Sequence, residues 1–327
     1  MQPIAITLGD PAGIGPEVAA KVIQEVKPQT PWVLVGAPWS LQRGAAAAGL
    51  KLPEVPVITT VAQATAPISL LATDTEEPAD FVFGEVQAAC GAIAVRAVEW
   101  AAQACLAGEV SAMVTCPLNK AAIHAAGYVD DLGHQEILAR LSGAEWTATM
   151  LMTPGLKVAH LSTHKSLIEA AHYVTQATVL EKLNLVHETL ATWGIEQPRI
   201  AVAALNPHGG ESGLLGREEI EEIAPAVEAA RAQGINVEGA IPADSVFNRA
   251  IDGEFDVVLA LYHDQGHIAI KVHNFHESTT ATLGIPFVRT SVDHGTAFDI
   301  AGQGIADATG LKAAIRTAED IVAGSLR

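Results

Sequence analysis

The most constraining feature of the sequence is a repeated alternation between short apolar runs and longer stretches with helical spacing. Strands that alternate with helices predict βαβ units and a largely parallel sheet covered on both faces. The sequence therefore predicts an α/β fold. We expect strands over 4–8, 32–36, 112–116, 149–152, 157–162, 200–205, 256–261 and 285–290, and helices over 16–26, 86–107, 134–142, 166–173, 177–193, 217–233 and 306–325.

The length of the chain limits the number of domains. Its 327 residues, 49% of them hydrophobic, suffice for a sizeable core and for two modest domains. A second strand–helix series begins after residue 130. We therefore expect a first α/β domain over 1–130 and a second over 131–290, with a cleft between them. The C-terminal segment 291–327 is expected to return to the first domain.

Charge and cysteine usage exclude several classes of function. The formal net charge of −18 argues against non-specific binding to nucleic acid or to an anionic membrane surface. No apolar run reaches the ~18 residues that a membrane-spanning helix requires, and the first residues lack a signal-type segment. Cys90, Cys105 and Cys116 are odd in number and show no C-x-x-C spacing. These features predict a cytoplasmic protein with reduced thiols.

Histidines follow three of the predicted strands. His164, His208 and His263 each come after an apolar run, and ligands of open α/β sheets bind at the carboxyl ends of strands. Three imidazoles with an open coordination position describe a catalytic divalent-metal site, to which Asp244 could add a carboxylate. The alternative is that each histidine is an ordinary hydrogen-bonded loop residue.

The loops around two predicted helices also attract notice. "ITLGDPAGIGPE" follows the first strand, and its glycines permit either a phosphate cradle or a plain structural turn, because the segment is neither G-x-G-x-x-G nor a Walker motif. "LNPHGGESG" precedes the helix that begins with Glu218 and Glu219, which we expect to stabilise the helix dipole.

Further polar residues suit recognition of an anionic substrate. His134 and Gln135 open a predicted helix, where they could cap it or contact a hydroxyl or phosphate oxygen. Lys271 and Arg289 lie close to predicted strands in a chain with only 19 lysines and arginines. Each is a candidate anion partner, with a solvated surface charge as the alternative.

Several segments together resemble the 4-hydroxythreonine-4-phosphate dehydrogenase family. They are "ITLGDPAGIGPEV", "LGHQE", "STHKSL", "LNPHGGESGLLGREE", "PADSVF", "YHDQGH" and "TLGIPFVRTSVDHGTAFDIAG", spread from residue 6 to about residue 310. The resemblance implies NAD-dependent oxidation of a secondary alcohol in a phosphorylated C4 hydroxy acid, followed by decarboxylation. It also implies two α/β/α domains similar to isocitrate and isopropylmalate dehydrogenases rather than a Rossmann domain, which accounts for the missing dinucleotide fingerprint.

The resemblance assigns roles to particular residues. It implies a divalent metal ion (zinc, magnesium or cobalt) and a homodimer whose two subunits build each site together. The matching positions are His164, His208 and His263 for the metal, His134, Lys271 and Arg289 for the substrate, and Asp244 beside the metal. Lys271 and Asp244 are the candidate catalytic residues.

Two departures from the family pattern concern substrate contacts. Gln135 stands where the family has threonine, and Thr280 stands where it has asparagine. The substrate is therefore either 4-hydroxythreonine 4-phosphate, as in pyridoxine biosynthesis, or 4-phospho-threonate or 4-phospho-erythronate, as in threonate catabolism. "GHIAIK" resembles the second branch, which we favour slightly.

Other classes of function remain open. A metal-dependent hydrolase or phosphatase of a small phosphorylated acid would suit three histidines equally well, and a non-catalytic binding protein could keep the same residues. A dehydrogenase of a non-phosphorylated diol acid is a further alternative, which the "GHQE" segment disfavours. The sequence does not indicate which residues bind the dinucleotide.

Overall fold

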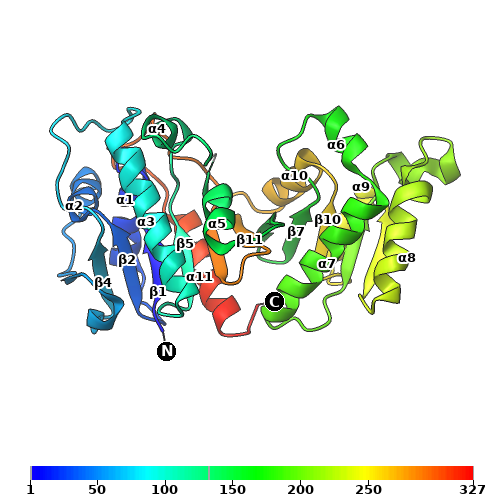
Figure 1. Ribbon diagram of the computed structural model, residues 1–327, viewed down its shortest axis with the longest axis horizontal. Helices are drawn as coiled ribbons and strands as arrows, with labels where there is room; N and C mark the ends of the chain where they lie inside the picture. Colours follow the sequence, from blue (N-terminus) through cyan, green and yellow to red (C-terminus); the bar gives the residue numbers. More distant parts are fainter. Residues whose placement is uncertain (1, 132, 327) are drawn as a thin grey trace. The chain divides into compact units, whose positions relative to one another are not determined.

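The computed structural model describes residues 2–131 and 133–326, and the chain divides into two compact units (Figure 1). Unit 1 contains Met1–Glu145 and Ile285–Val322, and unit 2 contains Trp146–Gly284 and Ala323–Arg327. Residues 131–145 and 285–290 thus belong to unit 1, although the sequence predicted them in the second domain. Packing explains this difference, because Ile137 and Leu138 are buried in a hydrophobic cluster of unit 1, against which Phe287 also packs.

In unit 1 the strands pair in parallel in the order β3-β4-β2-β1-β5-β12. The strands are β1 (Ile4–Thr7), β2 (Trp32–Gly36), β3 (Val57–Ile58), β4 (Ile68–Ala72), β5 (Ala112–Thr115) and β12 (Val288–Val292). The helices are α1 (Gly15–Glu25), α2 (Pro38–Ala47), α3 (Ala88–Leu106), α4 (Lys120–Ala125), α5 (His134–Ser142) and α11 (Thr309–Val322), with a 3₁₀ turn at Val61–Gln63.

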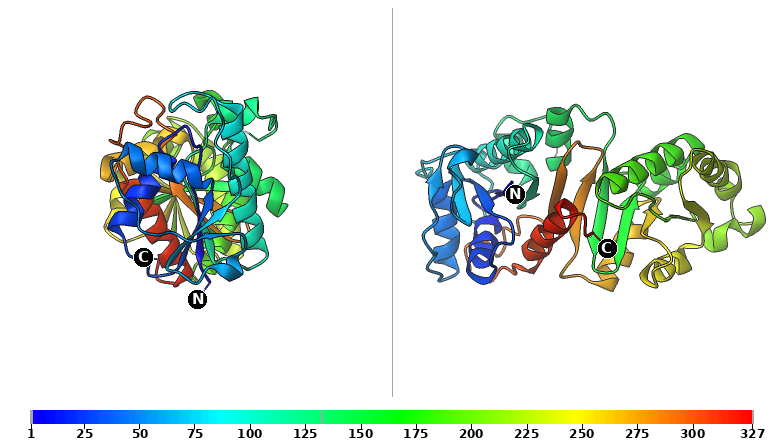
Figure 2. Two further views of the ribbon diagram at one scale, coloured as in Figure 1. Left: turned by 90° about the vertical axis from the view of Figure 1, so that its left-hand side faces the viewer. Right: turned by 90° about the horizontal axis from the view of Figure 1, so that it is seen from below.

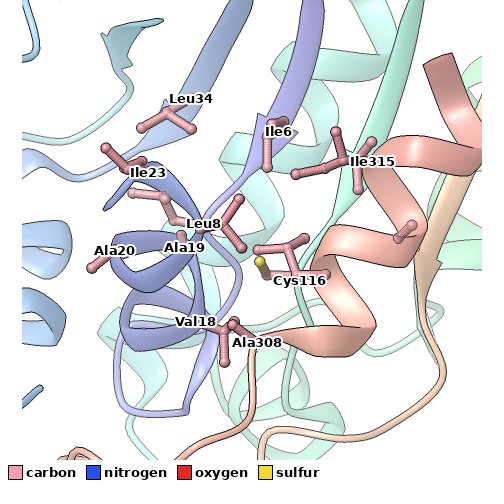
Figure 3. Packing of buried hydrophobic residues seen from close by; sticks show 14 of the residues in the cluster. Ile6, Leu8, Val18, Ala19, Ala20, Ile23, Leu34, Cys116, Ala308 and Ile315 are labelled. Carbon is pink, nitrogen blue, oxygen red and sulfur yellow. The ribbon is translucent and has the colours of Figure 1, made fainter. Parts of the chain in front are cut away.

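Side chains of β1 alternate between the two faces of this sheet, as strand geometry requires. Ile4 and Ile6 join the cluster that contains α1 and α11, whereas Ala5 joins the cluster that contains α3 and α5. Figure 3 shows Ile6 and Leu34 of the strands with Ile315 of α11 in the first of these clusters. The unit 1 sheet is therefore covered on both faces, and α1 and α11, which are coloured blue and red, belong to the same unit (Figure 2).

In unit 2 the strand order is β11-β6-β7-β10-β8-β9. β6 pairs antiparallel with β11 and β7, and the remaining pairs are parallel. The strands are β6 (Ala148–Thr153), β7 (Leu156–His160), β8 (Ile200–Ala203), β9 (Val237–Ile241), β10 (Val257–Ala260) and β11 (Thr279–Leu283). The helices are α6 (Leu167–Tyr173), α7 (Gln176–Thr192), α8 (Ala224–Ala232), α9 (Ala243–Ile251) and α10 (His263–His273).

One hydrophobic cluster joins the central strands of unit 2 to two of its helices. Val158 of β7 and Val258 of β10 pack with Val246 of α9 and Ile270 of α10. α10 is thereby packed against these strands, and it begins three residues after the end of β10. This arrangement determines where the polar residues after β10 point.

The predicted α/β class is confirmed, and each predicted strand and helix overlaps an observed one. The predicted helix over 217–233 is interrupted, since a π-helical turn at Glu219–Ile223 precedes α8. Pro225 near the start of α8 has no backbone N–H to donate, and a local change of helix type accommodates this loss. Among the described residues, no helix combines the length and apolar character that a membrane crossing would need.

Candidate active site

The three histidines singled out in the sequence follow neighbouring strands of unit 2. β10 pairs in parallel with β7 on one side and with β8 on the other. His164 follows β7, His263 begins α10 directly after β10, and His208 follows β8. Asp244 lies in the first turn of α9, which follows the next strand, β9. The carboxyl ends of four adjacent strands are thus each followed by a candidate residue.

In two of these histidines, the Nδ1 atom of the ring is hydrogen-bonded to a carboxylate. His208 Nδ1 lies 2.8 Å from Glu211 Oε1, and His263 Nδ1 lies 2.7 Å from Asp264 Oδ1. Because a carboxylate accepts, Nδ1 carries the hydrogen, and a neutral ring held in this way presents the lone pair of Nε2. The exposed fractions of the two histidine side chains are 66% and 45%. This carboxylate pairing is typical of histidines that bind metal through the other nitrogen.

The loop that carries His208 has an unusual backbone. His208, Glu211 and Ser212 adopt positive φ angles of 52°, 46° and 56°, a region that residues other than glycine seldom occupy. Such conformations persist where the surroundings impose them, and they concentrate at functional sites. The backbone conformation of this loop is therefore imposed by the structure around it.

Buried side chains connect these strand ends. Glu219 accepts hydrogen bonds from the backbone N–H groups of Leu205 (2.8 Å) and Asn206 (2.7 Å), so it shapes the His208 loop. Glu219, which was expected to stabilise a helix dipole, thus also holds the backbone of this loop. Gln265 accepts from Leu261 N (2.7 Å) and donates to Ala204 O (2.8 Å), which joins the ends of β10 and β8.

A row of three imidazoles runs from the His263 ring into the core of unit 2. The rings of His263 and His267 are stacked, with centroids 3.6 Å apart, and His160 follows at 4.7 Å from His267. His267 Nδ1 also donates to the His263 carbonyl oxygen at 3.0 Å. His160 is buried, and burial lowers its pKa to about 3, so this ring is neutral. Neither His267 nor His160 was among the candidate residues predicted from the sequence.

The described part of one chain does not complete a metal centre. Among residues 2–131 and 133–326, no three histidine, cysteine, aspartate or glutamate side chains form a group that could hold a metal ion. The donor chemistry of His208 and His263 nevertheless fits a divalent ion, since each belongs to an exposed side chain whose Nδ1 is held by a carboxylate.

Unit 1 encloses a second group of candidate residues. Arg289 of β12 is buried, and its Nε and Nη2 donate to Thr115 Oγ1 at 3.2 and 2.6 Å. His134 begins α5, and burial holds its pKa well below 6.5, with a further lowering from the Arg289 charge. The buried Nε2 of His134 makes no hydrogen bond within the described ranges. A buried guanidinium beside a neutral imidazole suits an oxyanion.

Asp10 adds a carboxyl group to the loop after β1. Its Oδ1 accepts from Ala12 N at 2.9 Å, and burial raises its pKa to about 6. Gly9 has a φ of 72°, and a Cβ there would lie 2.4 Å from the Pro117 carbonyl oxygen. Tight packing thus explains this glycine, which favours the structural turn over the phosphate cradle. The sequence motif contained Asp10, but only its glycines had been considered.

The remaining candidates occupy defined positions. Lys271 lies in the last turn of α10, with its Nζ 4.9 Å from the centre of the Phe275 ring. Gln135 is the second residue of α5, and Thr280 lies on β11 opposite Leu151. Cys116 is buried and its pKa is raised to about 12, so it carries no thiolate at neutral pH.

Comparison with known proteins identifies the family. The family described as "Pyridoxal phosphate biosynthetic protein PdxA" matches residues 28–318. The chain belongs to this family, which confirms the resemblance found in the sequence.

Two curated relatives are each 42% identical to the chain. One is a D-threonate 4-phosphate dehydrogenase of Pectobacterium atrosepticum, over 319 residues that cover 96% of this chain and 98% of that protein. The other is a 4-hydroxythreonine-4-phosphate dehydrogenase of Beijerinckia indica, over 315 residues that cover 95% and 93%. A crystal structure of 4-hydroxythreonine-4-phosphate dehydrogenase from Klebsiella pneumoniae is 40% identical, with a TM-score of 0.90 over 98% of this chain and 100% of that one.

Proposed function

We propose that this protein is an NAD-dependent and divalent-metal-dependent dehydrogenase of a phosphorylated C4 hydroxy acid. It oxidises the secondary alcohol, and the β-keto acid that results loses carbon dioxide. Membership of the family and the names of its relatives support a dehydrogenase. The structural observation that carries the proposal is the set of histidines behind three adjacent strands, two of them with Nδ1 fixed by a carboxylate.

His164, His208 and His263 are the proposed metal ligands, with Asp244 beside them. When bound, the ion supplies Lewis-acid polarisation of the substrate hydroxyl and of a neighbouring oxygen. Since the described part of one chain gathers no three-ligand group, we infer that two copies of the chain complete the ligand set in a homodimer. The same inference would place residues of both subunits around one substrate.

Arg289 and His134 are the proposed anion-binding residues. The buried guanidinium supplies charge and paired donors, and neutral His134 supplies a hydrogen bond without a second positive charge. A bound NAD would accept the hydride of the carbinol carbon, and a base of the protein would take the hydroxyl proton. Lys271 and Asp244 are the candidates for handling this proton, and Lys271 could also stabilise the charge left by decarboxylation.

The choice of substrate depends on Gln135 and Thr280. Both depart from the family pattern at expected substrate contacts, which leaves the substrate open. The segment "GHIAIK" is the reason why we favour 4-phospho-threonate or 4-phospho-erythronate over 4-hydroxythreonine 4-phosphate. The relatives carry both names at equal identity, and sequence identity therefore does not decide between these substrates.

A substrate panel tests the proposal. The purified protein is mixed with each phosphorylated C4 acid, NAD or NADP, and added zinc, magnesium or cobalt. We expect NADH absorbance and carbon dioxide with a phosphorylated acid, and little turnover of the non-phosphorylated diol acids. Phosphate release without NADH would instead indicate a hydrolase, and no turnover of any acid would indicate a binding protein.

Mixing two inactive variants tests the shared site. His208→Ala and His263→Ala homodimers are each expected to be inactive, but a hybrid dimer carries one intact ligand set if the two histidines come from different subunits. Partial recovery of activity after dissociation and reassociation supports the homodimeric site. Absence of recovery from a verified hybrid contradicts it.

A further inference from the structure

A cavity lies at the amino ends of the central strands of unit 2. Its volume is about 430 Å³, within the usual range of ligand pockets. Lys157 near the start of β7, Arg199 just before β8 and Asp256 just before β10 line it. The histidines described above follow the opposite ends of the same strands, so this cavity is separate from the proposed metal site.

Lys157 carries a charge without a close partner. The residue is 9% exposed, and within the described ranges its side-chain ammonium makes no hydrogen bond and no ion pair. Burial lowers its pKa, and the more distant Asp256 carboxylate only partly opposes this effect. Lys182 provides the contrast, because it is equally buried but donates to Thr147 O at 3.3 Å. Burial of an ammonium group is costly unless an anion or acceptor compensates it.

The other charges of the cavity neutralise one another. Asp256 Oδ2 accepts from Arg199 N (2.8 Å) and Nε (3.0 Å), and its Oδ1 accepts from Nη2 (2.8 Å). Arg199 Nη1 donates to Gly253 O at 2.7 Å. The guanidinium and the carboxylate are therefore committed to each other. The Lys157 ammonium is left as the uncompensated charge of the cavity wall.

The rest of the lining limits the shape and charge of a ligand. Leu156, Ile195, Ile251 and Phe255 supply apolar walls. A single ammonium matches one negative charge, and the Asp256 carboxylate in the same cavity wall would repel a dianion such as a phosphate ester more strongly than a monoanion. We propose that this cavity binds a small monocarboxylate with an apolar body, with its carboxylate on Lys157 and its carbon chain against these walls.

Calorimetric titration of the full chain with butanoate tests the proposal, with butanamide as the neutral probe of the same shape. We expect saturable binding of butanoate, and binding of butanamide that is at least about tenfold weaker, because a charge-assisted contact is lost. Lys157→Met should weaken butanoate binding by at least about tenfold. Lys182→Met, the matched buried lysine, should leave it unchanged.

Butanoate binding by two further variants completes the test. Ile251→Trp narrows the cavity from its partly exposed rim and should abolish butanoate binding even if Lys157→Met does not fold. Arg289→Lys should not affect butanoate binding, since that residue belongs to the anion site of unit 1. Failure of butanoate to saturate, equal binding of butanamide, or tighter binding of inorganic phosphate that Lys157→Met weakens and Arg289→Lys does not, would overturn the proposal.

Discussion

Unit 1 encloses its candidate residues, whereas unit 2 exposes those that matter most to the proposed chemistry. Arg289 is buried against Thr115, and His134 holds a buried nitrogen. In contrast, His208 and His263 expose large parts of their rings and hold one nitrogen on a carboxylate. Arg289 and His134 obtain their electrostatic properties from their own unit. The exposed rings have a defined orientation, but within residues 2–131 and 133–326 of one chain no metal-binding group of three side chains includes them. Their function therefore depends on what joins them.

The largest effect is expected from removing an exposed ring. His208→Ala should eliminate bound metal and lower kcat/KM by more than about 100-fold, since even the outer partners of metal-binding histidines contribute ~10–100-fold. Elemental analysis after desalting and NADH formation measure these losses. His172→Ala, an exposed histidine of α6, is the control and should behave as the wild type. Full activity of a metal-free His208→Ala protein would show that the exposed rings do not bind the catalytic ion.

Arg289→Lys tests the role of the buried guanidinium in unit 1. A lysine cannot reproduce the paired donors of the guanidinium, so kcat/KM should fall by about 100-fold, mainly through a higher KM. Steady-state kinetics with the best substrate of the panel measure this. Arg96→Lys, which changes an exposed ion pair with Asp74, should leave both constants within twofold. A KM unchanged by Arg289→Lys would remove this residue from the substrate site.

Asp10→Asn tests whether burying a carboxyl group in unit 1 lowers the free energy of unfolding. Burial raises its pKa from 3.8 to about 6, so the native state binds the proton more tightly than the unfolded state does. The stability linked to this proton is complete below pH 3.8 and is lost as the pH rises through about 6. Asp10→Asn should therefore raise the free energy of unfolding by about 3 kcal/mol at pH 8 and by little at pH 4.

Urea unfolding at the two pH values measures this difference. Asp252→Asn, which changes an exposed carboxyl group after α9, serves as the control and should show no such pH dependence. An Asp10→Asn protein that is less stable than the wild type at pH 8 would mean that the carboxylate has a stabilising partner.

The smallest effect is expected from His267, whose ring is stacked on that of His263. His267→Ala removes the stacked neighbour and should weaken metal binding by about tenfold, because outer partners orient the ligand ring. His267→Phe keeps an aromatic face and should recover most of that affinity. Competition with a metal-sensitive dye measures both variants. Equal affinity of His267→Ala and the wild type would show that the stack does not position His263.

The sequence predicted the position of His164, His208 and His263 relative to their strands, because an apolar run identifies a strand and its end. It could not predict that these strands are neighbours. β10 lies between β7 and β8 although β9 precedes it along the chain, and strand order follows from packing rather than from local composition. α10 was also missed, since the polar segment "HDQGH" hides its helical spacing.

Roles that depend on exact distances could not be predicted either. Gln265 acts through Leu261 N and Ala204 O, two backbone groups on different strands. The burial of Asp10 depends on segments far away in the sequence that cover its loop. In both cases the residue type was visible in a quoted motif, but its partners were not.

The discontinuous composition of unit 1 has a consequence for the order of folding during synthesis. Residues 146–284 of unit 2 are contiguous, so this unit can begin to fold while the ribosome is still adding β12 and α11. The first cluster of unit 1 lacks Leu311 and Ile315 until then, and Glu17 of α1 lacks its backbone donor Ala306 N. The earliest part of the chain to emerge is thus among the last to complete its core, and a nascent chain stalled before residue 306 would present α1 and β1 without their apolar cover.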